Sequence, residues 1–135
     1  MQEKSLEISR ALAEDLGTLE SRQDLLRDCI RTGDLYRCFS GGQDWEGKAL
    51  DLFQEAVGIA KENCAGGTYN AYEDFVTALS RLTEHPYVTA ESKKVNLKLL
   101  LTVTRKMAEE RPEKKYDQWI DMFKSALEKL NTDQE

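Results

Sequence analysis

The stretch VNLKLLLTVT, at residues 95–104, constrains the fold of this chain more than any other part of it. At about 100° per residue, its apolar side chains cover roughly two thirds of a helical wheel. The polar remainder is a narrow strip made of Lys94, Lys98, Thr102, Arg105 and Glu109. A helix that is apolar on most sides usually packs among several neighbours. We therefore predict that this segment is the central helix of an all-α domain.

Other segments show the spacing of amphipathic helices, and Gly or Pro stands near most of their ends. We expect them at residues 1–16, at 18–33 (with Gly33 as the end), at 44–64, at 70–82 and from Pro112 to about 130. Thr18 or Ser21, Asp44 and Thr89 are suitable N-caps. No period-2 alternation persists, and no Asn-Gly or Asp-Gly hairpin turn occurs. The sequence thus predicts about six helices in a compact bundle or a short superhelical stack.

The expected organisation has three parts. Residues 1–40 form an N-terminal helical arm that packs either on the bundle or on a partner chain, and Gly41-Gly42 ends it. Residues 41–131 form the helical bundle domain, and residues 132–135 form a polar tail. A chain of 135 residues is long enough to fold as one domain without disulfides or a metal.

Charge is distributed unevenly along the chain. Residues 1–90 hold 9 basic and 16 acidic groups, a net charge of −7, whereas residues 91–115 hold 8 basic and 4 acidic groups, a net charge of +4. The overall net charge of −6 argues against strong nonspecific DNA binding. Three cysteines and no secretory signal or apolar membrane segment predict an intracellular protein.

No set of residues predicts catalysis, a metal site or a cofactor. His85 is the only histidine, beside Pro86, and is predicted to be an ordinary loop histidine. Cys29 and Cys64 lie on apolar helix faces and are predicted to be core residues, while Cys38 could be exposed. Their spacing does not match the close ligand pairs of zinc sites. We therefore expect neither an enzyme nor a cofactor-binding protein.

Two surfaces are candidates for binding a partner. The first is the basic strip of Lys94, Lys98 and Arg105, which could be merely solvated or could bind an acidic peptide, a protein or a nucleic-acid backbone. The second is the N-terminal arm, whose leucines could mediate self-association in a homodimer. These residues are Leu6, Leu12, Leu16, Leu25 and Leu26.

From residue 35 to about 130, the order of features resembles the C-terminal helical domain of the large subunit of Ku, the DNA-end-binding heterodimer of non-homologous end joining. The resemblance lies in the Asp44-Trp45-Glu46 helix opening, the Tyr69-Asn70-Ala71-Tyr72 helix start, the segment ESKKVNLKLLL at 91–101 and Trp119 early in the last helix. It implies a six-helix, non-catalytic interaction domain. The acidic-hydrophobic tail that recruits the DNA-dependent protein kinase in that family has no counterpart at Asn131-Thr132-Asp133-Gln134-Glu135.

The sequence therefore predicts a non-catalytic protein–protein interaction domain of a DNA double-strand-break repair factor, nuclear if the resemblance holds. We expect protein partners, weak or no direct contact with DNA, and no membrane association. The alternative is a stand-alone helical adaptor or homodimerisation domain unrelated to DNA repair.

Overall fold

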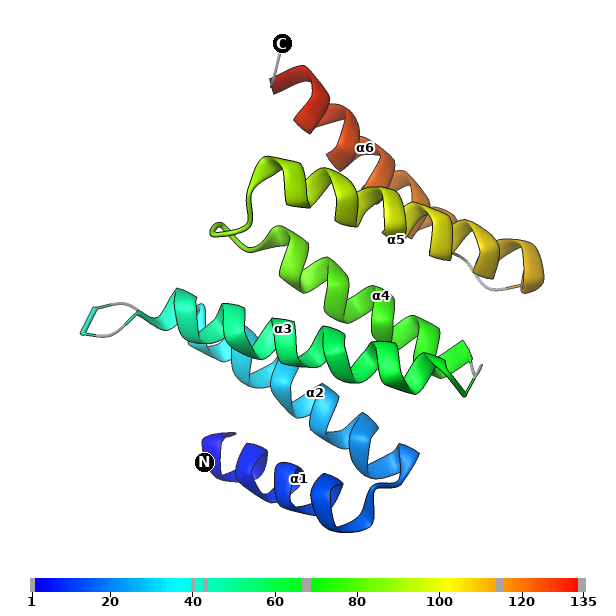
Figure 1. Cartoon of the computed structure of the whole chain (residues 1–135). Helices are drawn as coiled ribbons and strands as arrows, with labels where there is room; N and C mark the ends of the chain where they lie inside the picture. The colour runs from blue at the N-terminus through cyan, green and yellow to red at the C-terminus, as the bar shows by residue number, and fades with distance from the viewer. Residues whose placement is uncertain (1, 40, 43, 67–68, 114–115, 134–135) are drawn as a thin grey trace. The chain divides into compact units, whose positions relative to one another are not determined.

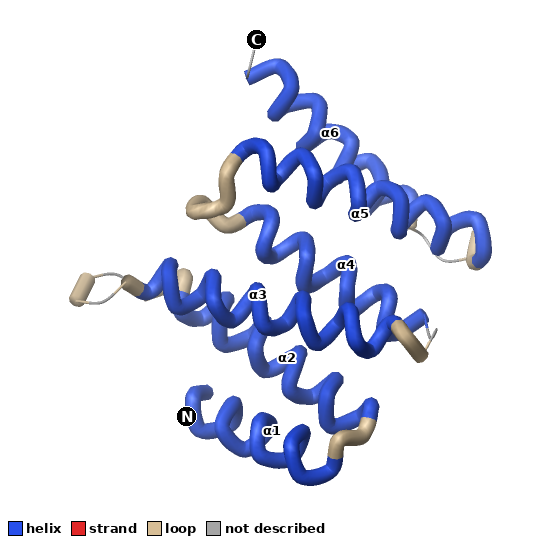
Figure 2. Tube along the Cα trace, in the orientation of Figure 1, coloured by secondary structure: helices blue, strands red, loops and turns tan. Residues whose placement is uncertain are grey.

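A computed structural model describes residues 2–39, 41–42, 44–66, 69–113 and 116–133 (Figure 1). Within these residues the chain forms six α-helices and no strand (Figure 2), which confirms the predicted all-α fold. The helices are α1 (Gln2–Leu16), α2 (Leu19–Tyr36), α3 (Trp45–Cys64), α4 (Tyr69–Glu84), α5 (Ala90–Glu110) and α6 (Asp117–Asp133).

Three predicted caps begin helices as expected. Thr18 accepts a hydrogen bond from the Ser21 N–H at 3.1 Å, Asp44 accepts one from the Gly47 N–H at 2.9 Å, and Thr89 accepts one from the Ser92 N–H at 3.2 Å. Each side chain thus satisfies a backbone donor that has no partner within its helix.

The chain divides into two compact units, Met1–Tyr87 and Val88–Glu135. This division differs from the predicted boundary near residue 40. The expected arm is part of the first unit, because α2 packs on α3 and α1 packs on α2. The Gly41-Gly42 segment connects α2 to α3 inside that unit, and both glycines have a positive φ, of 78° and 77°.

The core of the first unit lies where α3 packs against both α2 and α4 (Figure 1). Leu26 and Cys29 of α2, Phe53 of α3 and Val76 of α4 are almost completely buried. Gly33 was predicted to end α2, and this prediction was wrong, because the helix continues to Tyr36. The glycine instead lies inside the helix, where α2 meets Phe53 of α3.

Helix α1 attaches to the same unit through buried polar contacts as well as apolar ones. Leu6 is 5% exposed, and Ser9 donates a hydrogen bond to the buried carboxylate of Asp28 on α2. Arg10 adds a bidentate ion pair with Glu55 of α3, in which Nη2 lies 2.7 Å from Oε1 and Nε lies 3.3 Å from Oε2. The first unit is therefore an assembly of four helices.

The second unit is a helical hairpin in which α5 packs on α6. The prediction that α5 is buried on most sides was wrong, since Val95 is 66% exposed and Leu99 is 40% exposed. One neighbouring helix within the unit covers one face only. That covered face carries the buried residues of α5, which are Leu97, Leu100, Leu101, Thr104 and Met107.

Candidate functional site

A groove about 350 Å³ in volume runs between α5 and α6 within the second unit. Two members of the predicted basic strip, Lys98 and Arg105, line it. Lys94 lies one turn earlier on α5 and does not line the groove. We call this surface the basic groove. It is lined by Lys98, Leu101, Thr102, Arg105, Lys124, Leu127, Glu128 and Asn131.

The fold adds Lys124 of α6 to the two cations of α5. All three side chains are exposed, and none forms an ion pair with another described residue. Sequence reasoning missed Lys124 because the pairing of α5 with α6, and not chain proximity, places it there. The groove therefore combines three unpaired cations with the side chains of Leu101 and Leu127, with Glu128 as its one carboxylate.

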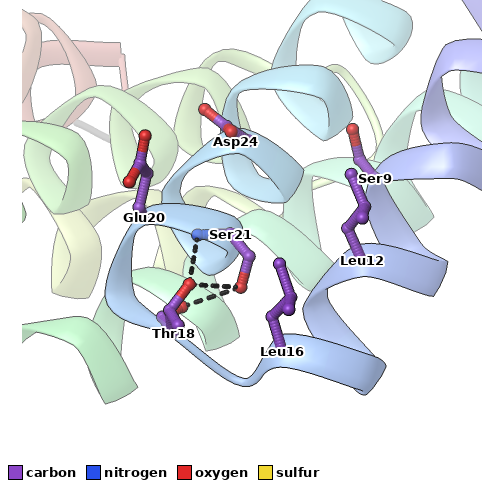
Figure 3. A pocket seen from close by; sticks show the side chains of 7 residues that line it. All are labelled: Ser9, Leu12, Leu16, Thr18, Glu20, Ser21 and Asp24. Carbon is purple, nitrogen blue, oxygen red and sulfur yellow. Dashed lines mark hydrogen bonds between the residues drawn. The ribbon is translucent and has the colours of Figure 1, made fainter.

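A second surface lies at the corner between α1 and α2 in the first unit. Ile8, Leu12 and Leu16 repeat every four residues along α1, and they are 55%, 47% and 61% exposed. Leu12 and Leu16 form the α1 side of a notch of about 260 Å³ (Figure 3). Glu20 and Asp24 line the same notch from α2. Ile8 was missed as a candidate, although its spacing from Leu12 is the signal that could have found it.

Burial separates the five leucines predicted for self-association into two groups. Leu6, Leu25 and Leu26 are buried inside the first unit, at 5%, 9% and 0% exposure, so they present no surface to a partner. Leu12 and Leu16 remain exposed. The reason is that α1 and α2 bury their shared face within the unit, and only the outer face of α1 remains uncovered.

Three carboxylates lie on the same corner as the exposed leucines. Asp15 follows Leu12 by three residues on α1, a spacing that places the two side chains on neighbouring parts of one helix face. Asp15, Glu20 and Asp24 are exposed, and among the described residues none of them forms an ion pair. We call this surface the acidic corner and define it as Ile8, Leu12, Asp15, Leu16, Glu20 and Asp24.

His85 is not the ordinary loop histidine that was predicted, because its side chain is completely buried. The Tyr87 N–H donates to Nδ1 at 3.1 Å, and Nε2 lies 2.7 Å from the Glu46 carbonyl oxygen. A carbonyl oxygen can only accept a hydrogen bond, so Nε2 carries the ring proton and is the donor of this bond. Both ring nitrogens are thus occupied by backbone groups. The histidine joins the end of α4 to the start of α3.

An exposed pair lies beside this buried ring. The Tyr87 hydroxyl donates to Asp44 Oδ1 at 2.8 Å, and Asp44 also caps α3. The Gly47 N–H, and then the Tyr87 hydroxyl, lower the pKa of Asp44, because both donate to the ionised carboxylate. The same bond raises the pKa of Tyr87, because Asp44 accepts from its neutral form. These contacts fix the Tyr87 end of the first unit to the N-terminus of α3.

The three thiols occupy different environments. Cys29 is completely buried, as predicted, and burial raises its pKa to about 12. Cys64, predicted to be a core residue, is only partly buried, and burial raises its pKa as well. Cys38 is exposed. A reactive thiolate requires a lowered pKa, so the raised values of Cys29 and Cys64 oppose that chemistry at these two positions.

Among the described residues, no group of three or more His, Cys, Asp or Glu side chains is arranged to hold a metal ion. No described helix combines the length and the apolar character needed to cross a membrane. Comparisons of the chain with family models, curated proteins and solved structures found no match.

Proposed function

We propose that this chain is a non-catalytic protein–protein interaction domain whose basic groove binds an acidic, amphipathic segment of a partner protein. The observation that supports the proposal is the convergence of Lys98, Arg105 and Lys124 on a groove that also exposes Leu127. Helix-in-groove recognition uses such a combination, with apolar anchors for affinity and charges at the edge for orientation and encounter rate.

The basic groove matters here because its three cations, Lys98, Arg105 and Lys124, form no ion pair with another described residue. A cation already engaged in an ion pair would have to give it up before binding an acidic segment. An unpaired cation does not, so it contributes to steering directly. Binding should therefore weaken as salt increases, because exposed charges are screened over about 8 Å at physiological ionic strength.

The test is fluorescence anisotropy with a labelled, unrelated amphipathic peptide that carries leucines on one face of a helix and glutamates on the other. We expect saturable binding that is lost with the double substitution Lys98→Glu and Arg105→Glu, which we call the groove variant. Lys61→Glu with Lys129→Glu is the matched control, since both lysines are exposed, neither lines the groove, and the change in net charge is the same. Equal binding by both double variants would refute the groove as the site.

Duplex DNA must be tested in the same assay. Three cations also suit a phosphate backbone, but the overall charge of −6 opposes it. We expect weak or no binding to DNA at low salt. Tight, salt-sensitive DNA binding that disappears in the groove variant would replace the protein-interaction proposal with a nucleic-acid one.

We further propose a role in DNA double-strand-break repair, and with it a nuclear location, on the resemblance to the Ku helical domain. Its support is the helix order and aromatic placement given above. The test is direct binding between purified end-joining proteins and the immobilised chain, with the groove variant as control. The stand-alone adaptor is the competing proposal, and absence of binding to every end-joining protein would favour it.

A further inference from the structure

We infer that the acidic corner of one copy of this chain docks on the basic groove of a second copy, in a head-to-tail arrangement. The inference rests on the proposed function, because it identifies the acidic, amphipathic partner of the groove as this chain itself. Both surfaces are present in every copy, one in each compact unit.

Charge complementarity is the first argument. The acidic corner presents three carboxylates (Asp15, Glu20, Asp24), and the basic groove presents three cations (Lys98, Arg105, Lys124). All six side chains are exposed, and none is neutralised by an ion pair with a described residue. Opposite potentials on two surfaces steer their encounter and fix their orientation.

The apolar side chains supply the second argument. Leu12 and Leu16 are 47% and 61% exposed, and they line the notch from α1 while Glu20 and Asp24 line it from α2 (Figure 3). Leu127, which is partly exposed, lies among the cations of the groove, with the buried Leu101 beside it. Docking of the corner on the groove would therefore bring leucines against leucines at the centre, with ion pairs around them. This is the usual distribution of apolar and charged groups in a protein interface.

The signs of the charges oppose a contact between two identical surfaces. Corner on corner would place three carboxylates of one copy against three of the other, and groove on groove would do the same with cations. Like charges brought together in an interface repel each other and strongly disfavour the contact. We infer a single corner-on-groove contact, which is heterologous and leaves each pair of copies with one unused corner and one unused groove. A wild-type chain whose mass stops at the dimer would instead indicate a reciprocal pair of contacts and overturn the head-to-tail arrangement. Heterologous contacts lead to closed rings or open chains.

The exposed apolar area is small, because it is limited to a few partly exposed leucines and Ile8. A standard stable interface buries about 800 Å² on each partner. Association should therefore be weak, reversible, promoted by concentration and reduced by salt.

Sedimentation velocity of the full chain, over a wide range of concentration and at low and high salt, tests the inference. We expect the mean mass to rise with concentration at low salt and to fall back when salt is added. The groove variant (Lys98→Glu with Arg105→Glu) and a corner variant (Asp15→Lys with Glu20→Lys) should each remain monomeric. The control with Lys61→Glu and Lys129→Glu should associate as the wild type does.

Mixing the two monomeric variants gives the sharpest result. The groove variant retains its corner and the corner variant retains its groove, so one intact contact forms and the mixture should stop at a one-to-one dimer. A chain with all four substitutions should associate again, because its reversed charges are still complementary. A mixture that stays monomeric, or one that grows beyond the dimer, would overturn the head-to-tail arrangement.

The failure of this inference can be separated from failure of the proposed function. A wild-type chain that is monomeric at every concentration but binds the leucine–glutamate peptide overturns self-association and leaves the groove function intact. A chain that associates equally well with and without the groove substitutions, and binds no peptide, overturns both.

Discussion

Gly33 of α2 lies directly against the aromatic ring of Phe53 on α3. A Cβ at position 33 would stand 2.5 Å from Cε1 of that ring, which is too close for two carbon atoms that are not bonded. The absence of a side chain therefore sets how closely the two helices approach. Phe53 is itself completely buried and has a T-shaped contact with His85, with ring centroids 6.4 Å apart. Gly33 thus controls the position of a ring at the centre of the first unit.

Substituting Gly33→Ala should destabilise the chain. Overpacking in a core costs about 1–3 kcal/mol, and the higher helix propensity of alanine returns only about 1 kcal/mol of it. We expect a net loss of about 1 kcal/mol in urea unfolding. Gly58→Ala is the matched control, because Gly58 also lies within a helix and a Cβ there would meet nothing within 4 Å. The free energy of unfolding of Gly58→Ala should rise by about 0.5–1 kcal/mol. A rise in both variants would contradict the packing argument.

Substituting His85→Ala should be more damaging. It leaves the Glu46 carbonyl and the Tyr87 N–H without their partner and opens a cavity beside Phe53. We expect a loss of about 2–4 kcal/mol in denaturant unfolding. Tyr87→Phe is the control, since it removes only the exposed hydroxyl contact with Asp44 and retains the backbone bond. The free energy of unfolding of Tyr87→Phe should be close to that of the wild type. Similar losses of stability in both variants would contradict the role given to the buried ring.

Substituting Ser9→Ala should loosen α1. The change removes a hydrogen bond to the buried Asp28 carboxylate, which keeps a 3.3 Å bond from Ser5. A bond to a charged group contributes about 1.5–3 kcal/mol. Amide hydrogen exchange across residues 2–16 should accelerate. Arg10→Ala provides the comparison, because it removes an exposed ion pair with Glu55 that should contribute about 1 kcal/mol or less. Exchange unchanged by Ser9→Ala would show that α1 does not depend on this bond.

The thiols should react in the order of their exposure. Cys38 should be labelled first by a thiol reagent at neutral pH, then Cys64, and Cys29 only on unfolding. The raised pKa of Cys29 also links to stability. Its pKa is about 12 in the folded chain against the ordinary value of 9.0, so between these pH values the folded state keeps a proton that the unfolded state loses.

The stabilising contribution of Cys29 is therefore complete below about pH 9 and is lost as the pH rises towards 12. Stability of the wild type should fall more steeply across this interval than stability of Cys29→Ala. Mass spectrometry after labelling, and urea midpoints at a series of pH values, measure the two effects. Parallel pH profiles would contradict the assigned shift.

The helices and their starts could be predicted because they depend on local chemistry. Thr18, Asp44 and Thr89 satisfy backbone donors three residues away, and such short-range contacts are written in the sequence itself. The end of α2 could not be predicted, because Gly33 serves a contact with a residue twenty positions later. The sequence alone does not distinguish a glycine that allows two helices to approach closely from a glycine that ends a helix.

The candidate surfaces were only partly predictable for a related reason. Lys98 and Arg105 share one helix, so periodicity was sufficient to group them, whereas Lys124 joins them through the packing of α6. The hydrophobicity of α5 suggested neighbours on most sides, yet Val95 and Leu99 are exposed. Periodicity reports which faces of a helix are apolar, and the number of partner helices decides how many of those faces are covered.

The ring of His85 has a consequence for the order of folding. Its partner carbonyl at Glu46 lies 39 positions earlier in the chain, so the contact can close only after α3 and α4 have come together. We predict that this interaction forms late and contributes little to the folding transition state, so that His85→Ala has a low φ-value. Removing it should therefore accelerate unfolding much more than it slows folding. On this prediction the buried histidine affects chiefly how long the first unit stays folded, and folding and unfolding rates of His85→Ala measured against denaturant would check it.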